Sequence, residues 1–190
     1  FGCCPNLTSI IIPTSVSVIG DMCFDRCKSL SRISIPSSVT IIGSGCFVSC
    51  TNLTELIIEE GNEHYVMYGG NLFNKAKSRM VKYLASNTST SFNIPTSVSE
   101  IDKFCFFLST SLLSISIPTS VNKIGYRCFR ECKSMTSVSI AASVNKIGEY
   151  CFRDCSSLTS VSIPTSVSKI GQYCFYDCNL MTGISISTSV

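Results

Sequence analysis

A dipeptide of cysteine followed by phenylalanine recurs along the chain at a fixed interval. Successive copies start 23 residues apart, except that the second and third are separated by 59 residues, and the six cysteines are Cys23, Cys46, Cys105, Cys128, Cys151 and Cys174. A fixed period of this length is the signature of a repeat architecture, because one such unit is too short to bury its own apolar side chains. The chain is therefore predicted to fold as a stack of similar units that bury a continuous core.

Each unit contains one stretch with the pattern of a β-strand. In LTSVSI, residues 158–163, apolar residues alternate with serine, which predicts a short strand with Val161 and Ile163 inward and the serines outward. Pro164 follows where the strand ends, so its missing N–H costs little pairing. Gly171 is expected to permit a tight bend before the next segment. Stacked units would then place their strands in one parallel sheet, about 4.8 Å apart.

The cysteine-containing part of each unit is predicted to be one short α or 3₁₀ turn. In the last copy the apolar residues Cys174, Phe175, Cys178 and Met181 stand at positions i, i+1, i+4 and i+7, which lie on one side of a helical turn. That side is expected to face the core. The phenylalanines of successive units should then form one buried column.

The repeated unit, seen in CFRDCSSLTSVSIPTSVSKIG at residues 151–171 and in its copies, resembles the leucine-rich repeat of the BspA type. The resemblance implies a solenoid with a parallel β-sheet on its concave face and short helical or 3₁₀ turns on the other side. It also implies a binding or adhesive role rather than catalysis. The chain departs from the family pattern at the first cysteine of each pair, where the family more often has alanine, which is also small.

Within this solenoid the sequence predicts three segments. Residues 1–58 and residues 95–190 are regular repeats, and residues 59–94 form a variant rung, where a rung is one turn of the solenoid. The first array starts and the second ends in the middle of a repeat, and neither end has the polar cap that a solenoid needs. We therefore expect one continuous solenoid domain that is a fragment of a longer chain.

The thirteen cysteines are the strongest candidates for chemistry. Four thiolates from two neighbouring units, such as Cys23, Cys27, Cys46 and Cys50, would suffice for a structural zinc site. However, their apolar neighbours disfavour the thiolate form, and neither the spacing within a pair nor that between strands suits a disulfide. We therefore predict reduced thiols that fill the core, with no metal site and no disulfide. Many unpaired thiols favour a reducing compartment such as the cytoplasm, whereas the family resemblance favours the cell surface.

No arrangement of residues suggests catalysis. His64 is the only histidine, Gly69-Gly70 is too short for a phosphate-binding loop, and no pair of carboxylates stands out. We expect neither an enzyme activity nor a cofactor. A net charge of +3 without a long basic run gives no footprint for nucleic acid, and no apolar run approaches the ~20 residues of a membrane span.

Residues 59–94 are the predicted contact site for a protein partner. The stretches NLF and RMVKYL flank NKAKS, which predicts a β-hairpin. Aromatic and cationic side chains gather here, and the predicted partner-binding residues are His64, Tyr65, Tyr68, Lys75, Lys77, Arg79, Lys82 and Tyr83. The alternative site is the concave strand face, whose outward serines and threonines are otherwise a solubilising cover. Asn87 would be a glycosylation site if the chain is secreted.

These features predict a non-catalytic protein–protein interaction scaffold of the leucine-rich-repeat type. The alternative is a cell-surface adhesin that binds extracellular-matrix or host-cell proteins, which is the role that the resemblance implies for surface members of the family. In either case the expected partner is a protein.

Overall fold

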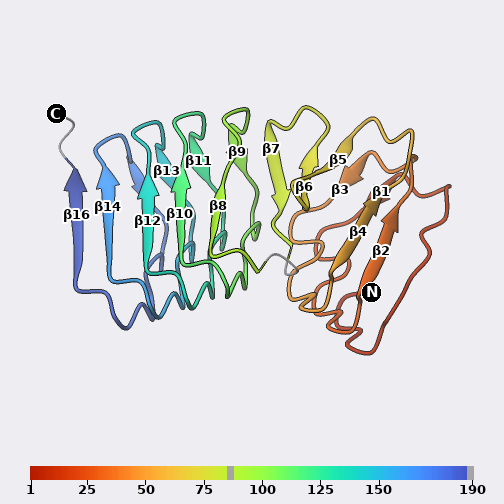
Figure 1. Ribbon diagram of the computed structural model, residues 1–190, viewed down its shortest axis with the longest axis horizontal. Coiled ribbons are helices and arrows are strands. Elements are labelled where there is room, and N and C mark those ends of the chain that lie inside the picture. Colours follow the sequence, from red (N-terminus) through yellow and green to blue (C-terminus); the bar gives the residue numbers. More distant parts are fainter. Residues whose placement is uncertain (85–87, 188–190) are drawn as a thin grey trace. The chain divides into compact units, whose positions relative to one another are not determined.

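The structure is a computed structural model that describes residues 1–84 and 88–187. It divides into two compact units, residues 1–87 and residues 88–190, which run from red to yellow and from green to blue in Figure 1. Within the described residues the regular secondary structure is entirely β-strand. The predicted segments 1–58, 59–94 and 95–190 of one continuous solenoid stay a prediction.

In the first unit, equivalent residues of successive rungs pair in parallel. β1 (Val18–Ile19) pairs with β3 (Ile41–Ile42), and β2 (Arg32–Ile35) pairs with β4 (Glu55–Ile58). Paired residues are 23 positions apart, which is the repeat length read from the sequence. The parallel solenoid and its register are therefore confirmed in this unit.

The first unit ends in two antiparallel hairpins. Their strands are β5 (Tyr65–Tyr68), β6 (Asn71–Asn74) and β7 (Arg79–Lys82), so the predicted hairpin around NKAKS is confirmed as the pair of β6 and β7. The hairpin of β5 and β6 was not predicted. Its two central residues, Gly69 and Gly70, have φ values of 55° and 74°, as a tight two-residue hairpin turn requires.

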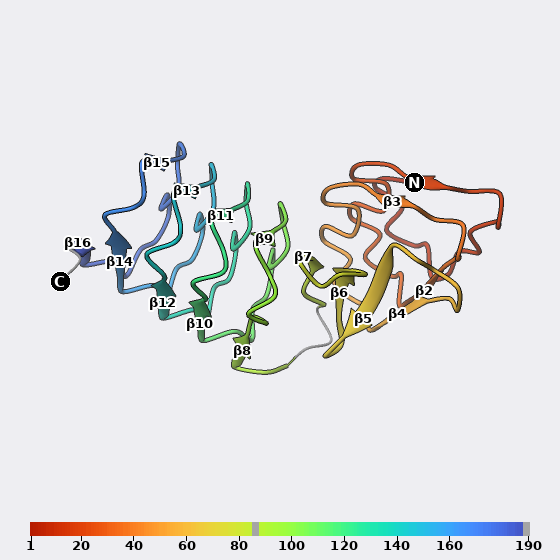
Figure 2. The same ribbon diagram turned by 90° about the horizontal axis from the view of Figure 1, so that it is seen from above.

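The second unit is the most regular part of the chain, and each of its complete rungs contributes two strands. The longer strands form one parallel sheet and are β8 (Ser91–Asn93), β10 (Ser114–Ile117), β12 (Ser137–Ile140), β14 (Ser160–Pro164) and β16 (Gly183–Ser187). The two-residue strands are β9 (Glu100–Ile101), β11 (Lys123–Ile124), β13 (Lys146–Ile147) and β15 (Lys169–Ile170). Figure 2 shows the two sets on opposite sides of the coil. The shorter set was not predicted.

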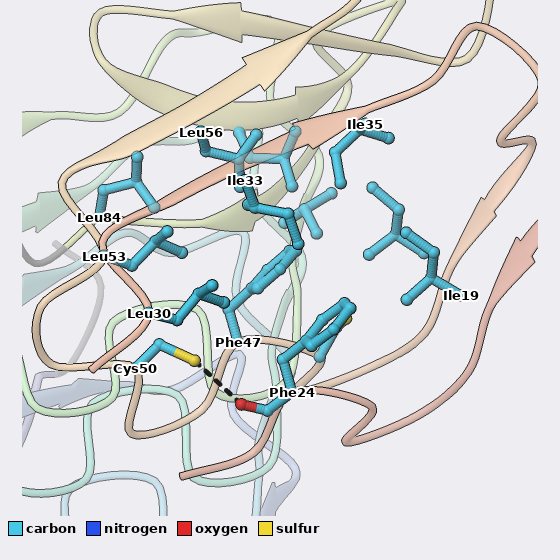
Figure 3. Close-up of a cluster of buried hydrophobic side chains, with 14 of the residues drawn as sticks. Ile19, Phe24, Leu30, Ile33, Ile35, Phe47, Cys50, Leu53, Leu56 and Leu84 are labelled. Carbon is cyan, nitrogen blue, oxygen red and sulfur yellow. Dashed lines mark hydrogen bonds between the residues drawn. The ribbon is translucent and has the colours of Figure 1, made fainter. Parts of the chain in front are cut away.

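Stacked phenylalanines run through the core of each unit. Phe152 is fully buried, and its ring lies 5.3 Å from that of Phe129 and 5.5 Å from that of Phe175, nearly parallel to both. In the first unit Phe24 and Phe47 stack in the same way at 5.8 Å, and Figure 3 shows them beneath the isoleucines and leucines of the strands. The predicted aromatic column is confirmed.

The cysteine-containing segments are not helical, which corrects the prediction of short α or 3₁₀ turns. They are series of hydrogen-bonded turns, in which, for example, the Cys132 N–H donates to the Phe129 carbonyl at 3.3 Å. The residue before each paired cysteine is left-handed, as Arg127 and Glu131 are at φ values of 50° and 61°. A left-handed residue every fourth position prevents a helix. Alternate N–H groups instead donate to the next rung, as Phe129 does to the Cys151 carbonyl at 2.9 Å.

Close packing of the backbones requires the glycine that precedes the cysteine pair in several rungs, although Gly20 has open space at its Cβ position. A Cβ atom added to Gly148 would lie 2.6 Å from the backbone of Gly125, and one added to Gly171 would lie 2.3 Å from the backbone nitrogen of Glu149. Neither Gly148 nor Gly171 has a positive φ. A left-handed backbone is therefore not what selects glycine at these two positions, and the observed reason is that successive rungs nearly touch at this column.

Candidate binding surfaces

The cysteines lie mostly inside the two units, and the second cysteine of a pair makes a specific contact. The Cys50 thiol donates a hydrogen bond to the Phe24 carbonyl of the preceding rung at 2.9 Å, as Figure 3 shows. The same bond joins Cys155 to the Phe129 carbonyl at 3.1 Å. It recurs between residues 26 positions apart at Cys27, Cys132 and Cys178. These thiols therefore connect neighbouring rungs as well as filling space.

Burial makes the core thiols poor nucleophiles and poor metal ligands. Loss of solvation raises the pKa of Cys50 and of Cys174 to about 12, and that of Cys178 to about 11. The pKa of Cys151 is raised well above its ordinary value for the same reason. The thiolate is the form that attacks electrophiles and binds zinc, so these groups are neutral near pH 7. In the described part of the chain, no group of three or more His, Cys, Asp and Glu residues is arranged to hold a metal ion.

Two residues of the predicted contact cluster belong to the core, which corrects that set. The ring of Tyr65 is 5% exposed, and its hydroxyl accepts a hydrogen bond from the Ile42 N–H at 2.7 Å. Tyr83 is 2% exposed. Beside them the buried amide of Asn62, which the sequence did not suggest, donates to the carbonyls of the preceding rung at 2.9 and 3.1 Å. These side chains anchor the hairpins to the solenoid.

The rest of the predicted cluster is partly engaged within the chain. His64, Tyr68 and Lys75 are exposed, whereas Lys77, Arg79 and Lys82 are half-buried. The Lys77 ammonium lies 4.2 Å above the Tyr68 ring, and the Lys75 ammonium donates to a backbone carbonyl at 3.0 Å. The hairpin surface, defined by His64, Tyr68, Lys75 and Lys77, is therefore small. Asn87, the predicted glycosylation site, lies outside the described residues.

The outward side of the long strands is a hydroxyl surface. A shallow groove of about 330 Å³ crosses β8, β10 and β12, and its polar lining residues are Ser91, Asn93, Ser114, Ser116, Ser137 and Ser139. We call it the serine face. Beside it, the Thr136 hydroxyl donates to the Leu113 carbonyl at 3.2 Å and the Thr159 hydroxyl to the Thr136 carbonyl at 3.3 Å. These threonines thus bind the backbone of the preceding rung, and the groove has no charged lining residue.

Aromatic and cationic side chains from separate rungs meet on the turn side of the second unit. We call this set the tyrosine–arginine ladder, and its members are Tyr126, Arg127, Tyr150, Arg153, Tyr173 and Tyr176. The ring of Tyr150 stacks on that of Tyr173 at 5.3 Å and meets that of Tyr126 edge-on at 5.8 Å. Tyr126 and Tyr150, on internal rungs, are half-buried. Tyr173 and Tyr176, on the last described rung, are 55% and 48% exposed, and Ile184 and Ile186 of the same rung are exposed as well.

The two arginines of the ladder lie against its rings. The Arg127 guanidinium is 4.8 Å from the ring centre of Tyr126 and 5.0 Å from that of Tyr150. The Arg153 guanidinium is 4.7 Å from Tyr176 and also forms an ion pair with Asp154 at 3.3 Å. These cation–π contacts hold the arginine side chains in place, so that little conformational freedom remains to be lost on binding.

The ladder was not predicted, because its members do not share one repeat position. Tyr150 and Tyr173 directly precede a cysteine, whereas Tyr126 stands one residue earlier and Arg127 takes the equivalent place. Tyr150 and Tyr173 are also left-handed, with φ values of 56° and 53°. Such a backbone is uncommon for a bulky residue, and glycine occupies the same position as Gly45 in another rung. A tyrosine at a position that suits glycine was the one sequence signal that could have indicated the ladder.

The chain is similar to a known family and to several solved structures. The family model described as the BspA type leucine rich repeat region, with six copies, matches residues 1–84 and 81–190. The crystal structure of the pneumococcal vaccine antigen PcpA has a TM-score of 0.87 at 22% identity, over 96% of this chain and 51% of that one. A leucine-rich repeat protein from Eubacterium ventriosum has a TM-score of 0.76 at 24% identity, over 94% and 54%.

A third solved structure, a leucine rich cell surface protein from Faecalibacterium prausnitzii, has a TM-score of 0.75 at 25% identity, over 93% of this chain and 53% of that one. The chain therefore spans about half the length of these structures. No curated protein matches the chain significantly. Among the described residues there is no helix with the length and apolar character needed to cross a membrane.

Proposed function

Because the chain belongs to the BspA-type leucine-rich repeat family, we propose that it is a non-catalytic scaffold that binds a protein partner through the tyrosine–arginine ladder. The proposal is carried by one observation, the gathering of tyrosine rings from successive rungs around the guanidinium groups of Arg127 and Arg153, with Tyr126 and Tyr150 half-buried on internal rungs. Tyrosine and arginine are the residues that most often dominate protein interfaces, because they combine contact area with directed hydrogen bonds.

The stiffness of the surrounding backbone supports this proposal. Each rung of the ladder region is hydrogen-bonded to the next, for example from the Tyr150 N–H to the Gln172 carbonyl and from the Asp154 N–H to the Tyr176 carbonyl, both at 2.9 Å. Side chains on such a backbone are preorganised, which lowers the entropy cost of association. The serine face has no charged lining residue and one half-buried ring, that of Phe92, and the hairpin surface offers one exposed tyrosine.

The non-catalytic part of the proposal rests on the state of the potential nucleophiles. The buried thiols are neutral, because burial raises the pKa of Cys50 and Cys174 to about 12. A cysteine nucleophile needs a lowered pKa or an adjacent general base. The only histidine of the sequence, His64, lies on the exposed hairpin surface.

A photo-crosslinking experiment tests the contact surface. A photoreactive amino acid is placed at position 173, 68 or 137 of the full-length protein in its source cells, so that it samples the ladder, the hairpin surface or the serine face. We expect a discrete crosslink to one protein from position 173. The affinity of that protein is then measured for a Tyr173→Gly, Tyr176→Ser double variant, with an expected loss of about tenfold or more.

Glycine at position 173 suits the left-handed backbone, so this variant removes the ring without straining the fold. Tyr68→Ser with Arg79→Glu on the hairpins and Ser137→Arg on the serine face are the matched controls, and each variant is first shown to unfold at the wild-type temperature. Full affinity of the ladder variant together with loss of binding in a control would assign the contact to the control's surface and contradict the proposal.

The second candidate function is a cell-surface adhesin. It is favoured by the fold shared with the leucine rich cell surface protein of Faecalibacterium prausnitzii. The two candidates differ in the compartment that they require. Surface biotinylation of intact source cells separates them, since an adhesin is labelled without permeabilisation and an intracellular scaffold is labelled only after it. A secretory segment upstream and a glycan on Asn87 would accompany the first result.

A further inference from the structure

A basic groove lies next to the tyrosine–arginine ladder in the second unit. It has a volume of about 430 Å³, and four of its lining residues are lysines from successive rungs, namely Lys103, Lys123, Lys146 and Lys169. It is also lined by Ile124 and Ile147, whose side chains are fully buried, and by the two close-packed glycines, Gly148 and Gly171. We call it the lysine groove. Because Tyr126 lines the groove and also belongs to the ladder, the two surfaces are continuous.

The lysines repeat at the spacing of the strands. Lys123 pairs with Lys146 and Lys146 pairs with Lys169 in the parallel register of β11, β13 and β15. Neighbouring strands are about 4.8 Å apart, so the three ammonium groups start from backbone positions that bring like charges together. Like charges opposite one another on adjacent strands destabilise a sheet. The same column contains Glu100, which is opposite Lys123 on β9, so the like charges that face one another are those of Lys123, Lys146 and Lys169.

None of these ammonium groups is neutralised within the described residues. Lys103, Lys123, Lys146 and Lys169 are all exposed, and none lies within 4.0 Å of a carboxylate in the part of the chain that the structure describes. The one carboxylate that lines the groove is that of Glu149.

The same lack of a counter-charge applies to Arg127, whose guanidinium is held between two rings of the ladder. Its Nε is buried without a hydrogen-bond partner, and Arg127 forms no ion pair with any described residue. A buried donor without a partner is costly, and a bound acceptor would relieve that cost. The Nε of the neighbouring Arg153 is also buried without a hydrogen-bond partner, but Arg153 has a counter-charge in Asp154 at 3.3 Å.

We propose that the lysine groove binds an acidic segment of the protein partner, with carboxylates spaced along the lysine column and one of them on Arg127. This proposal rests on the proposed function, because it names the chemistry of the same partner. A polypeptide suits the site better than a simple polyanion does, because the charged column continues into the tyrosine rings of the ladder. Carboxylates would remove the repulsion between the lysines, and apolar side chains of the partner would cover the rings.

The probe is a fluorescein-labelled peptide that alternates glutamate with tyrosine, and its binding is followed by fluorescence anisotropy. We expect binding at ~0.01 M ionic strength and loss of most of it at ~1 M, where the Debye length falls from about 30 Å to about 3 Å. Lys123→Glu with Lys146→Glu is expected to weaken binding about tenfold or more, and Arg127→Gln several-fold. A heparin arm is run in parallel.

Lys28→Glu with Lys133→Glu is the matched control, because both lysines are exposed, neither lines the groove, and the change in net charge is the same. Retained binding in this control with loss in the groove variant supports the proposal. Equal loss in both variants, no peptide binding at low salt, or heparin binding without peptide binding overturns it. These peptide-binding outcomes are independent of the crosslink at position 173. The groove proposal can therefore be contradicted while the ladder proposal is supported, and the reverse.

Discussion

The thiol of Cys155 donates a hydrogen bond to the backbone carbonyl of Phe129, 3.1 Å away in the preceding rung. That carbonyl also accepts the Cys132 N–H at 3.3 Å, which closes a turn within its own rung. The thiol therefore ties a turn of one rung to a turn of the next, at the place where the phenylalanine stack runs. A residue in this position is small and able to donate one hydrogen bond, and cysteine meets both conditions, as does the buried Ser109 in the rung of Phe106.

Replacing Cys155 by alanine is expected to lower the free energy of unfolding by about 1–2 kcal/mol. The loss combines one weak hydrogen bond with the packing of one sulfur atom, and the Phe129 carbonyl keeps its backbone partner. Denaturant unfolding under reducing conditions measures the change. Cys3→Ala is the control at an exposed thiol, expected within about 0.5 kcal/mol of wild type. Equal stability of the two variants would show that the thiol contact contributes nothing.

Truncation of Phe152 to alanine is expected to cost about 3–5 kcal/mol. The ring is fully buried between those of Phe129 and Phe175, so its removal leaves a cavity that the stacked backbones are unable to close. Thermal and denaturant unfolding report the cost. Phe1→Ala, at a ring that is 67% exposed, should change stability by much less. A cost below about 1 kcal/mol for Phe152→Ala would overturn the 23-residue register.

A methyl group on Gly148 is expected to destabilise the chain by about 3 kcal/mol or more, because it would meet the Gly125 backbone at 2.6 Å. Gly20 belongs to the same column but has open space at its Cβ position, so Gly20→Ala is a matched control. Comparing the unfolding midpoints of the two variants tests the close approach directly. Similar midpoints would mean that the rungs are further apart at this column than the structure has them.

Alkaline pH is expected to destabilise the protein through its buried thiols. The ordinary thiol pKa is 9.0, and burial raises it to about 12 for Cys50 and Cys174 and well above 9.0 for Cys151. Above pH 9 the unfolded chain therefore loses thiol protons that the folded chain keeps. The buried thiols therefore do not lower the free energy of unfolding below pH 9. Above pH 9 this free energy falls by about 1.4 kcal/mol per pH unit for each thiol that is fully buried.

The measurement is the free energy of unfolding at about pH 7.5 and about pH 10 with a reductant, for wild type and for Cys151→Ala. The variant should lose less stability over this interval, by an amount corresponding to one proton. Alanine is a conservative choice because the side chain stays small. Two results would be inconsistent with buried neutral thiols. One is a wild-type free energy of unfolding that does not fall between the two pH values, and the other is an equal fall in Cys151→Ala.

The regular features of the fold could be predicted because every rung repeats them. The Cys-Phe interval predicted the register, and the alternation in 158–163 predicted β14. The turns were misread because the i and i+4 spacing of Cys174 and Cys178 suits a helix and a series of turns equally well. What distinguishes the two is a left-handed backbone, and residues such as Arg127 at φ 50° and Glu131 at φ 61° carry no signature of it.

The candidate sites were harder to predict because they depend on which side chains face outward and which rungs meet. Tyr65 and Tyr83 looked like contact residues by type, yet both are buried. The ladder joins Tyr126 to Tyr150 and Tyr173, at intervals of 24 and 23 residues, and so departs from the strict period at one step. The lysine column could be read from the sequence, but its lack of counter-charges is a property of the folded chain.

Alkylation of the native protein, followed by intact mass measurement and metal analysis, tests the structural role of the cysteine columns most directly. If the paired cysteines are neutral core residues, the native protein labels quickly at the exposed Cys3 and slowly at the buried thiols. The unfolded protein labels at all thirteen, and protein purified without chelators contains no zinc. Stoichiometric zinc, or an unfolded mass that shows disulfides, would contradict this role.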